Sequence, residues 1–135
     1  MKAIPDIAFR LLQQALIKNF PKPSMEYIYH LASPAWFQAQ KINSEYLPEQ
    51  FSEDGFIHCC YPNQLLGVLS RYFQNTEHLM LLVIDRDKVS CDVVDENTHG
   101  GTELFPHIYG ALPLAAVLRT YPLTRNEKGI FDLPE

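Results

Sequence analysis

The chain has 135 residues, of which 47% are hydrophobic and 20% charged, and its formal net charge is −5. That length predicts a single domain able to bury its own core. No apolar run approaches the roughly 18 residues of a membrane helix. No cluster of Lys and Arg offsets the acidic balance, so the composition gives no sign of a membrane or nucleic-acid partner.

The cysteines indicate a reducing environment. The chain has 3 of them, and two are the neighbours Cys59 and Cys60. An odd count that includes an adjacent pair makes a poor disulfide framework. We therefore expect a cytoplasmic protein.

The first segment has the pattern of an amphipathic helix. Its apolar residues recur at helical spacing between a proline near the start and the sequence PKPS: Ile7, Leu11, Leu12, Ala15 and Leu16. We expect residues 1–24 to form a helical extension. Its apolar stripe suits either the domain's own core or the contact of a homodimer.

Two strand-then-helix units follow. Residues 25–32 read as a strand rich in aromatic and β-branched residues, after which Ser33 can cap a helix that begins at Pro34. Residues 56–60 read as a second strand. The helix after it has one predicted apolar face, made of Leu65, Leu66, Leu69, Tyr72 and Phe73.

The second half is predicted to be rich in strands. Residues 78–85 and 89–96 flank a turn and look like an antiparallel pair. Residues 103–110 are extended around Pro106, residues 112–123 form a helical turn and a last strand, and residues 124–135 form an irregular tail. The pattern predicts a single α+β domain with helices beside mixed or antiparallel sheets.

Three histidines interrupt the most hydrophobic segments: His30, His58 and His107. A polar ring in an apolar strand costs about 1 to 3 kcal/mol unless its nitrogens find partners. One cleft that gathers the three would explain them together. The alternative is that they are core or edge histidines satisfied by the backbone, and the sequence leaves both interpretations open.

Other chemistries have weaker patterns. The histidines and cysteines could coordinate zinc, but no CxxC, HxxxH or HExxH spacing occurs, so no metal is expected.

A thiol nucleophile at Cys59 or Cys60 is a further hypothesis, and its alternative is the common burial of cysteine in apolar strands. Carboxylates near the third histidine could orient a ribose or stabilise a developing cation: Asp95, Glu96 and Glu103. A solvated loop carboxylate is the alternative for each.

Five stretches together resemble one family: IYHLASPAWF, GFIHCC, LLVIDRDKV, VVDE and ELFPHIYGALPLAAV. Over about residues 26 to 123 the chain is similar to the DUF952 family, and GFIHC and FPHIYG are its most specific stretches. We therefore expect a DUF952-like domain over residues 25–123, with residues 1–24 and 124–135 outside it.

The resemblance implies a fold similar to the ADP-ribosyltransferase superfamily, in which a split mixed or antiparallel sheet holds NAD in a cleft. By that resemblance His30 matches the first-strand ribose contact, and His58 and Tyr61 belong to the second strand. Glu96 or Glu103 is the candidate catalytic carboxylate. His107 and Tyr109 complete the expected ligand-binding set. The chain departs from the family at Cys60 and Tyr61, where Ser-Thr is usual.

Two functions follow from this resemblance. The first is an enzyme that binds NAD or a related nucleotide as substrate and transfers ADP-ribose. The second is a non-catalytic module that binds a nucleotide or metabolite in the same histidine-lined cleft. Both need the same histidines, so the sequence does not separate them.

Overall fold

The computed structural model describes residues 26–134. The helix predicted over residues 1–24, and the dimer contact expected of it, lie outside the described residues. Within that part of the chain the protein is α+β, with antiparallel sheets, few helices and a single domain.

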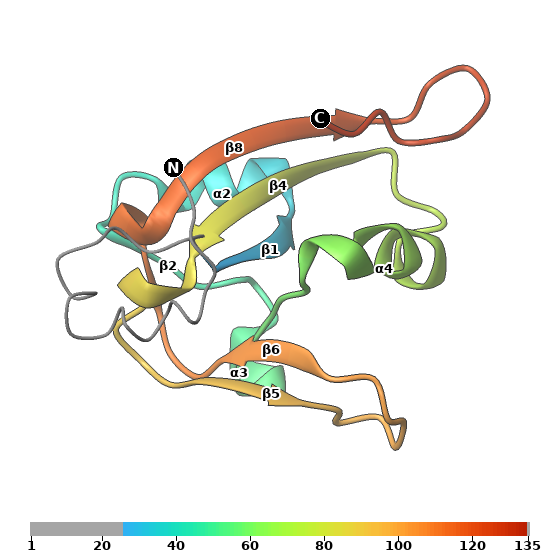
Figure 1. Ribbon diagram of the computed structural model, residues 1–135. Coiled ribbons are helices and arrows are strands. Elements are labelled where there is room, and N and C mark those ends of the chain that lie inside the picture. The colour runs from blue at the N-terminus through green and yellow to red at the C-terminus, as the bar shows by residue number, and fades with distance from the viewer. Residues whose placement is uncertain (1–25, 135) are drawn as a thin grey trace, which may run out of the picture.

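The larger sheet has three antiparallel strands in the order β1-β4-β8: β1 (Tyr27–Ala32), β4 (His78–Asp85) and β8 (Val117–Thr124). Figure 1 shows β4 running between the other two. The burial of β1 alternates, with Ile28, His30 and Ala32 buried. Period-2 alternation of this kind places one side of the strand against the core.

The smaller sheet is also antiparallel, in the order β3-β6-β5: β3 (Ile57–His58), β6 (Phe105–Ile108) and β5 (Val93–Glu96). A two-stranded pair joins β2 (Glu45–Tyr46) to β7 (Leu112–Pro113). His58 pairs directly with His107 in the register of β3 and β6. Directly opposed residues point to the same face of a sheet.

One predicted pairing is wrong. Residues 78–85 and 89–96 do not form a hairpin, because β4 pairs with β1 and β8 whereas β5 pairs with β6. After β4 the chain turns through η3 (Arg86–Lys88), and Val89 and Cys91 then pack against the core on the way to the smaller sheet. Both edges of β4 are occupied by strands that are distant in the sequence, β1 and β8. β5 therefore pairs with β6 instead.

The predicted helices occur where their caps and apolar spacing place them. Ser33 accepts a hydrogen bond from the Trp36 N–H and caps α2 (Pro34–Gln40). α3 (Phe51–Asp54) is a single turn, and η2 (Pro62–Gln64) leads into α4 (Leu65–Tyr72). Only part of the predicted face of α4 is buried, because Leu66 and Tyr72 are 69% and 59% exposed.

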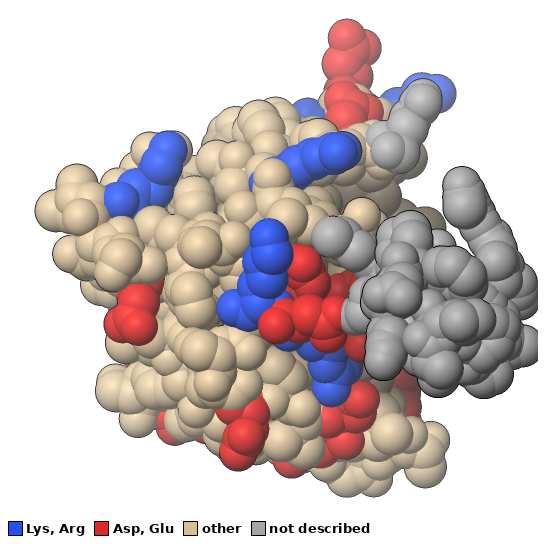
Figure 2. Space-filling model, turned by 60° about the vertical axis from the view of Figure 1, so that its left-hand side comes forward, with Lys and Arg blue, Asp and Glu red and all other residues tan. Residues whose placement is uncertain are grey.

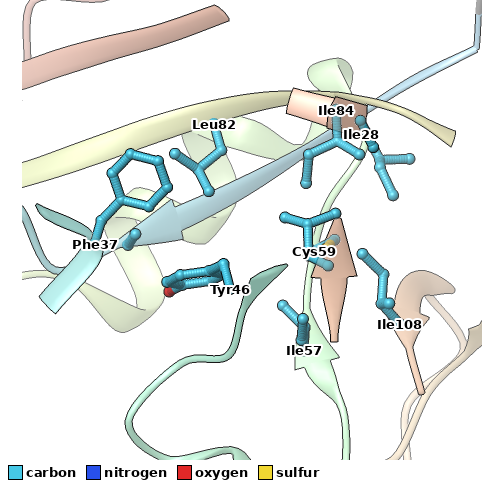
Figure 3. Close-up of a cluster of buried hydrophobic side chains, with 11 residues drawn as sticks. Ile28, Phe37, Tyr46, Ile57, Cys59, Leu82, Ile84 and Ile108 are labelled. Carbon is cyan, nitrogen blue, oxygen red and sulfur yellow. The ribbon is translucent and has the colours of Figure 1, made fainter. Parts of the chain in front are cut away.

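Two backbone hydrogen bonds connect the larger sheet to the segment after β3. The Tyr29 N–H donates to the Cys60 carbonyl (2.7 Å), and the Cys60 N–H donates to the Tyr29 carbonyl (2.8 Å). The core fills the space on either side of this bridge. Figure 3 shows one cluster, in which Tyr46 and Cys59 lie among isoleucines from both sheets.

The tail after β8 folds back on the domain. Residues 114–116 (η4) lead into β8, and beyond it Arg125 forms an antiparallel bridge with Phe131. Phe131 packs into a second buried cluster with Leu79 and Leu123. The tail predicted to be irregular therefore contributes to the core.

The surface mixes charges of both signs. Figure 2 shows one face of the molecule, on which acidic and basic side chains adjoin near the middle and uncharged residues cover most of the area. Among residues 26–134, no helix combines the length and the hydropathy needed to cross a membrane.

Candidate functional site: a histidine-lined cleft

A cleft of about 590 Å³ brings the three histidines together. Its lining residues come from β1, α2 and α4, and from β3, β6 and the loop after β5. His30, His58 and His107 all line it, and so do His78 and His99. The structure therefore places the predicted histidines at one cavity, although they are separated by up to 77 residues, from 30 to 107.

His30 is satisfied entirely by protein groups. Its Nδ1–H donates to the His58 carbonyl (2.6 Å), and its Nε2 accepts from the Tyr46 hydroxyl (2.9 Å). The backbone carbonyl can only accept, which fixes the Nδ1–H tautomer. Burial lowers the pKa of His30 to about 4, against the opposing effect of the hydrogen bond to His58. His30 is thus neutral and holds β1 to β3.

His58 is half exposed and is paired with Asp54. Its Nε2 lies 3.1 Å from Asp54 Oδ2, and its side chain is 51% exposed. Gly55 adopts φ +82° between α3 and β3, a left-handed conformation that glycine accepts without steric cost and that ends the helix. Partial burial lowers the pKa of His58, while Asp54 opposes that shift.

His107 is buried and is paired with Glu96. Its Nδ1 lies 2.9 Å from Glu96 Oε2, and the Tyr109 hydroxyl donates to the same carboxylate oxygen. These two hydrogen bonds hold the pKa of Glu96 below its usual range. The Phe56 ring stacks on the His107 ring at 4.0 Å between centroids and 18° between planes, which fixes the orientation of the imidazole.

Among the three predicted histidines, two ring nitrogens have no hydrogen-bond partner within residues 26–134: His58 Nδ1 and His107 Nε2. The two rings are 5.5 Å apart between centroids. His107 is only 3% exposed, so its Nε2 is a nearly buried polar atom. Leaving such an atom unpaired costs about 1 to 3 kcal/mol. Unlike His30, these two histidines can therefore accept a contact from a ligand.

Tyr61, expected at the ligand, belongs to a separate cluster outside the cleft lining. Its hydroxyl donates to Asp95 Oδ1 (2.5 Å) and accepts from Arg86 Nη1, and Arg86 also donates to the Val93 carbonyl (3.2 Å). Burial, and then the hydrogen bond to Asp95, raise the pKa of Tyr61 to about 12. This cluster connects η3 with β5.

The two candidate carboxylates also lie outside the cleft lining. Glu96 reaches the cleft only through His107. Glu103 receives hydrogen bonds from Arg71 (3.4 Å) and from Gln64 Nε2 (3.2 Å), which hold it beside α4. Tyr109 is 41% exposed and touches the site through Glu96 and the Phe56 ring.

The cysteines have the environment of core residues. Cys59 lies among Ile57, Ile84 and Ile108 in Figure 3. Burial raises the pKa of the Cys59 thiol, and burial followed by Glu103 raises the pKa of Cys60 to about 12. Because the thiolate is the nucleophile, both shifts oppose thiol catalysis. Among the described residues, no three His, Cys, Asp or Glu side chains are grouped to hold a metal ion.

Several lining residues were not identified from the sequence. Asp54 and Glu49 are the cleft's carboxylates, and Trp36, Tyr72, Phe73 and Phe105 contribute aromatic wall. The indole N–H of Trp36 donates to the Leu47 carbonyl (2.7 Å), which holds that ring in place. Asp54 had a signal in the sequence, since it precedes His58 by four residues across a glycine. His99 lies in a polar loop and His78 at the polar start of β4, and neither sequence context gave a signal.

The fold and the site define a small α+β protein with a histidine-lined cleft between two antiparallel sheets. The family described as "Protein of unknown function (DUF952)" matches residues 30–120. The chain therefore belongs to the DUF952 family, as its motifs predict.

Solved structures of one bacterial protein are similar. The crystal structure of CC0527 from Caulobacter crescentus is 28% identical, with a TM-score of 0.69 over 79% of this chain and 94% of that one. A double mutant of CC0527 gives the same values, and its solution NMR structure gives a TM-score of 0.66. No curated protein matches the chain. The family and these structures bring no assigned activity with them.

Proposed function

We propose that the histidine-lined cleft binds NAD or a related nucleotide. One observation carries the proposal: His58 and His107 face one cleft, each tied to a carboxylate through one ring nitrogen, and the other nitrogen of each has no partner within residues 26–134. Such nitrogens suit the hydroxyl groups of a ribose. An unpaired, nearly buried nitrogen lowers the stability of the fold, and a hydrogen bond to a ligand would explain why it is present.

The shape of the cleft supports the same ligand class. Its volume of about 590 Å³ lies within the roughly 300 to 1,000 Å³ of small-molecule sites. Aromatic residues along the wall offer flat apolar surface for a base or a nicotinamide ring. The two three-stranded antiparallel sheets support an ADP-ribosyltransferase-like split sheet, which we include in the proposal.

The test is an NMR titration of the full chain with NAD, ADP-ribose and nicotinamide, observing histidine side chains and backbone amides. We expect shifts centred on His58 and His107, with half-saturation in the micromolar to millimolar range. His58→Ala should weaken binding at least fivefold. Tyr61→Phe is the matched control, because Tyr61 is expected at the ligand from the sequence but is not among the residues that line the cleft.

Two results would contradict the proposal. One is the absence of any shift with all three ligands at millimolar concentration. The other is a set of shifts that follows Tyr61 and is unaffected by His58→Ala.

A second candidate function is transfer of ADP-ribose from NAD. The contact between Glu96 and His107 favours it, because the carboxylate holds the imidazole in the tautomer whose Nε2 can accept a proton. In this reaction the bond from ribose C1′ to nicotinamide breaks and nicotinamide leaves with the electron pair. The acceptor oxygen bonds to C1′, and its proton passes to His107 Nε2.

Nicotinamide release from NAD tests the transfer, with water as acceptor. Glu96→Gln should lower kcat about 100-fold and leave KM within threefold, since Glu96 acts through His107 and does not touch the ligand. Glu103→Gln is the control and should leave both constants unchanged. An absence of nicotinamide release by the wild-type protein rejects transfer and leaves nucleotide binding standing.

The cytoplasmic location and a homodimer formed through residues 1–24 belong to the same proposal. Sedimentation of the full chain measures the oligomeric state directly. A monomer at all concentrations up to about 100 µM would reject a dimer with micromolar affinity.

A further inference from the structure

The charge of the cleft wall favours the uncharged nucleoside part of a nucleotide over its phosphate groups. The wall carries two carboxylates, Glu49 and Asp54, and no Lys or Arg from residues 26–134 lines it. Phosphate groups in proteins are bound by cationic side chains and by backbone N–H groups at helix N-termini. A wall with this charge disfavours a phosphate and accepts an uncharged group.

Two arginines next to lining residues, Arg71 and Arg125, are already engaged. Arg125 lies behind the part of the wall that contains Phe73 and Thr76, and its guanidinium donates to the carbonyls of Thr76 (2.8 Å), Gln74 (3.1 Å) and Phe73. Arg71, next to Tyr72, donates to the Gly67 carbonyl (3.1 Å) and to Glu103 (3.4 Å). To reach a phosphate in the cleft, either arginine would have to leave these acceptors.

The ring nitrogens without a partner, His107 Nε2 and His58 Nδ1, are hydrogen-bond acceptors in the neutral rings. A carboxylate can only accept, so the hydrogen between His107 and Glu96 is on His107 Nδ1, and that between His58 and Asp54 is on His58 Nε2. In the neutral rings, His107 Nε2 and His58 Nδ1 then present lone pairs. Lone pairs accept from hydroxyl groups and oppose phosphate oxygens.

The rings of His58 and His107 are neighbours at the cleft. The centroids of His58 and His107 are 5.5 Å apart, and the two residues are direct partners in the register of β3 and β6. Phe56 packs against both rings, at 4.6 Å from His58 and 4.0 Å from His107, and holds them in this arrangement. A ribose offers two adjacent hydroxyl donors, whereas a phosphate offers acceptors.

We propose that the cleft takes the nucleoside part of its ligand, with the ribose hydroxyls on His107 Nε2 and His58 Nδ1, and leaves any phosphate outside in solvent. This inference rests on the nucleotide-binding function proposed above and specifies the ligand class; it does not rest on ADP-ribose transfer, in which His107 Nε2 takes a proton instead. His30, whose two ring nitrogens are occupied by His58 and Tyr46, takes no part in the contact.

The test is calorimetry of the full chain at pH 7.5 with adenosine, AMP, ADP, nicotinamide riboside and NAD, each at 50 and 300 mM NaCl. We expect each nucleoside to bind within about threefold of its phosphorylated form, with little change between the two salt concentrations. The 2′-deoxy and 3′-deoxy forms of adenosine should bind about tenfold more weakly, because each leaves one histidine nitrogen unpaired.

A charge reversal at the wall sharpens the test. Glu49 is exposed, so the ammonium group in Glu49→Lys can reach a phosphate in the adjoining solvent. The variant should strengthen AMP and ADP binding about fivefold or more and leave adenosine, which has no phosphate, within twofold. Glu127→Lys makes the same charge change at an exposed residue outside the cleft and should alter neither.

The outcomes separate this inference from the function on which it rests. Phosphorylated ligands that bind the wild-type chain more than tenfold tighter than their nucleosides would overturn the nucleoside assignment and leave nucleotide binding in place. Deoxyadenosines that bind as well as adenosine would overturn the hydroxyl contacts. If no compound in the series binds, both proposals fail.

Discussion

His30 and His107 are buried to nearly the same degree, 5% and 3% exposed, yet their rings are used differently. The ring of His30 joins the larger sheet to β3 and Tyr46, with both nitrogens paired inside the protein. The ring of His107, in the smaller sheet, is paired with Glu96 on one side only. Burial by itself therefore does not tell a structural histidine from one that can contact a ligand; the partners of both nitrogens do.

The largest expected effect comes from removing the paired histidine. His30→Ala should lower the free energy of unfolding by about 3 to 4 kcal/mol, because it opens a cavity and leaves the His58 carbonyl and the Tyr46 hydroxyl unpaired. Urea denaturation measures this change. His78→Ala, at an exposed histidine, should cost less than about 0.5 kcal/mol. Equal effects of the two variants would contradict the structural role of His30.

The pH dependence of stability tests the same histidine. The pKa of His30 is about 4 in the folded protein and 6.5 in its ordinary state, so between these values the unfolded chain holds more protons than the folded one. Stability therefore rises with pH across this window, and about 3 kcal/mol is lost between pH 7 and pH 4.

Urea denaturation of the wild-type protein and of His30→Gln across pH 4 to 7 isolates this contribution. Other titrating groups contribute to both proteins and cancel in the difference. If the two proteins show the same pH dependence, the neutral, buried His30 is not its source.

A smaller effect is expected at the cluster outside the cleft. Tyr61→Phe removes the hydrogen bonds to Asp95 and Arg86 and should cost about 1 kcal/mol of stability. Because Tyr61 does not line the cleft, nucleotide affinity should stay within twofold. Thermal denaturation measures the stability and calorimetry measures the nucleotide affinity. A loss of affinity without a loss of stability would show that Tyr61 contacts the ligand.

The smallest effect is expected at Glu103. Its contacts with Arg71 and Gln64 are exposed, and exposed ion pairs contribute about 0 to 1 kcal/mol. Glu103→Gln should therefore change stability by less than about 0.5 kcal/mol and ligand affinity by less than twofold. A larger loss of affinity in calorimetry would show that Glu103 reaches the ligand.

Much of the fold could be predicted from local patterns. The alternation in residues 27–32, the cap at Ser33 and the apolar spacing around Leu65 and Leu69 each predict an element that the structure contains. The pairing of β5 could not be read in the same way. A turn between two strand-like segments favours a hairpin, but β4 takes its partners from β1 and β8, which are distant in sequence.

The candidate site was predictable in its histidines and not in its carboxylates. Polar rings in apolar strands stand out in a sequence, which is why His30, His58 and His107 were identified. Glu96 and Glu103 were equivalent candidates, because their contacts depend on tertiary neighbours. Only the structure shows Glu96 behind His107 and Glu103 beside Arg71.

Motifs, periodicity and polar interruptions are properties of neighbouring residues, so the family, the α+β class and the three histidines could be predicted without the structure. Tertiary structure decided which ring nitrogens are occupied, which carboxylates support them and which residues form the wall. Those properties depend on contacts across strands, such as His58 with His107, that one-dimensional patterns do not contain. The difference between a histidine with both ring nitrogens paired, such as His30, and one with a single paired nitrogen, such as His107, is fixed by those contacts.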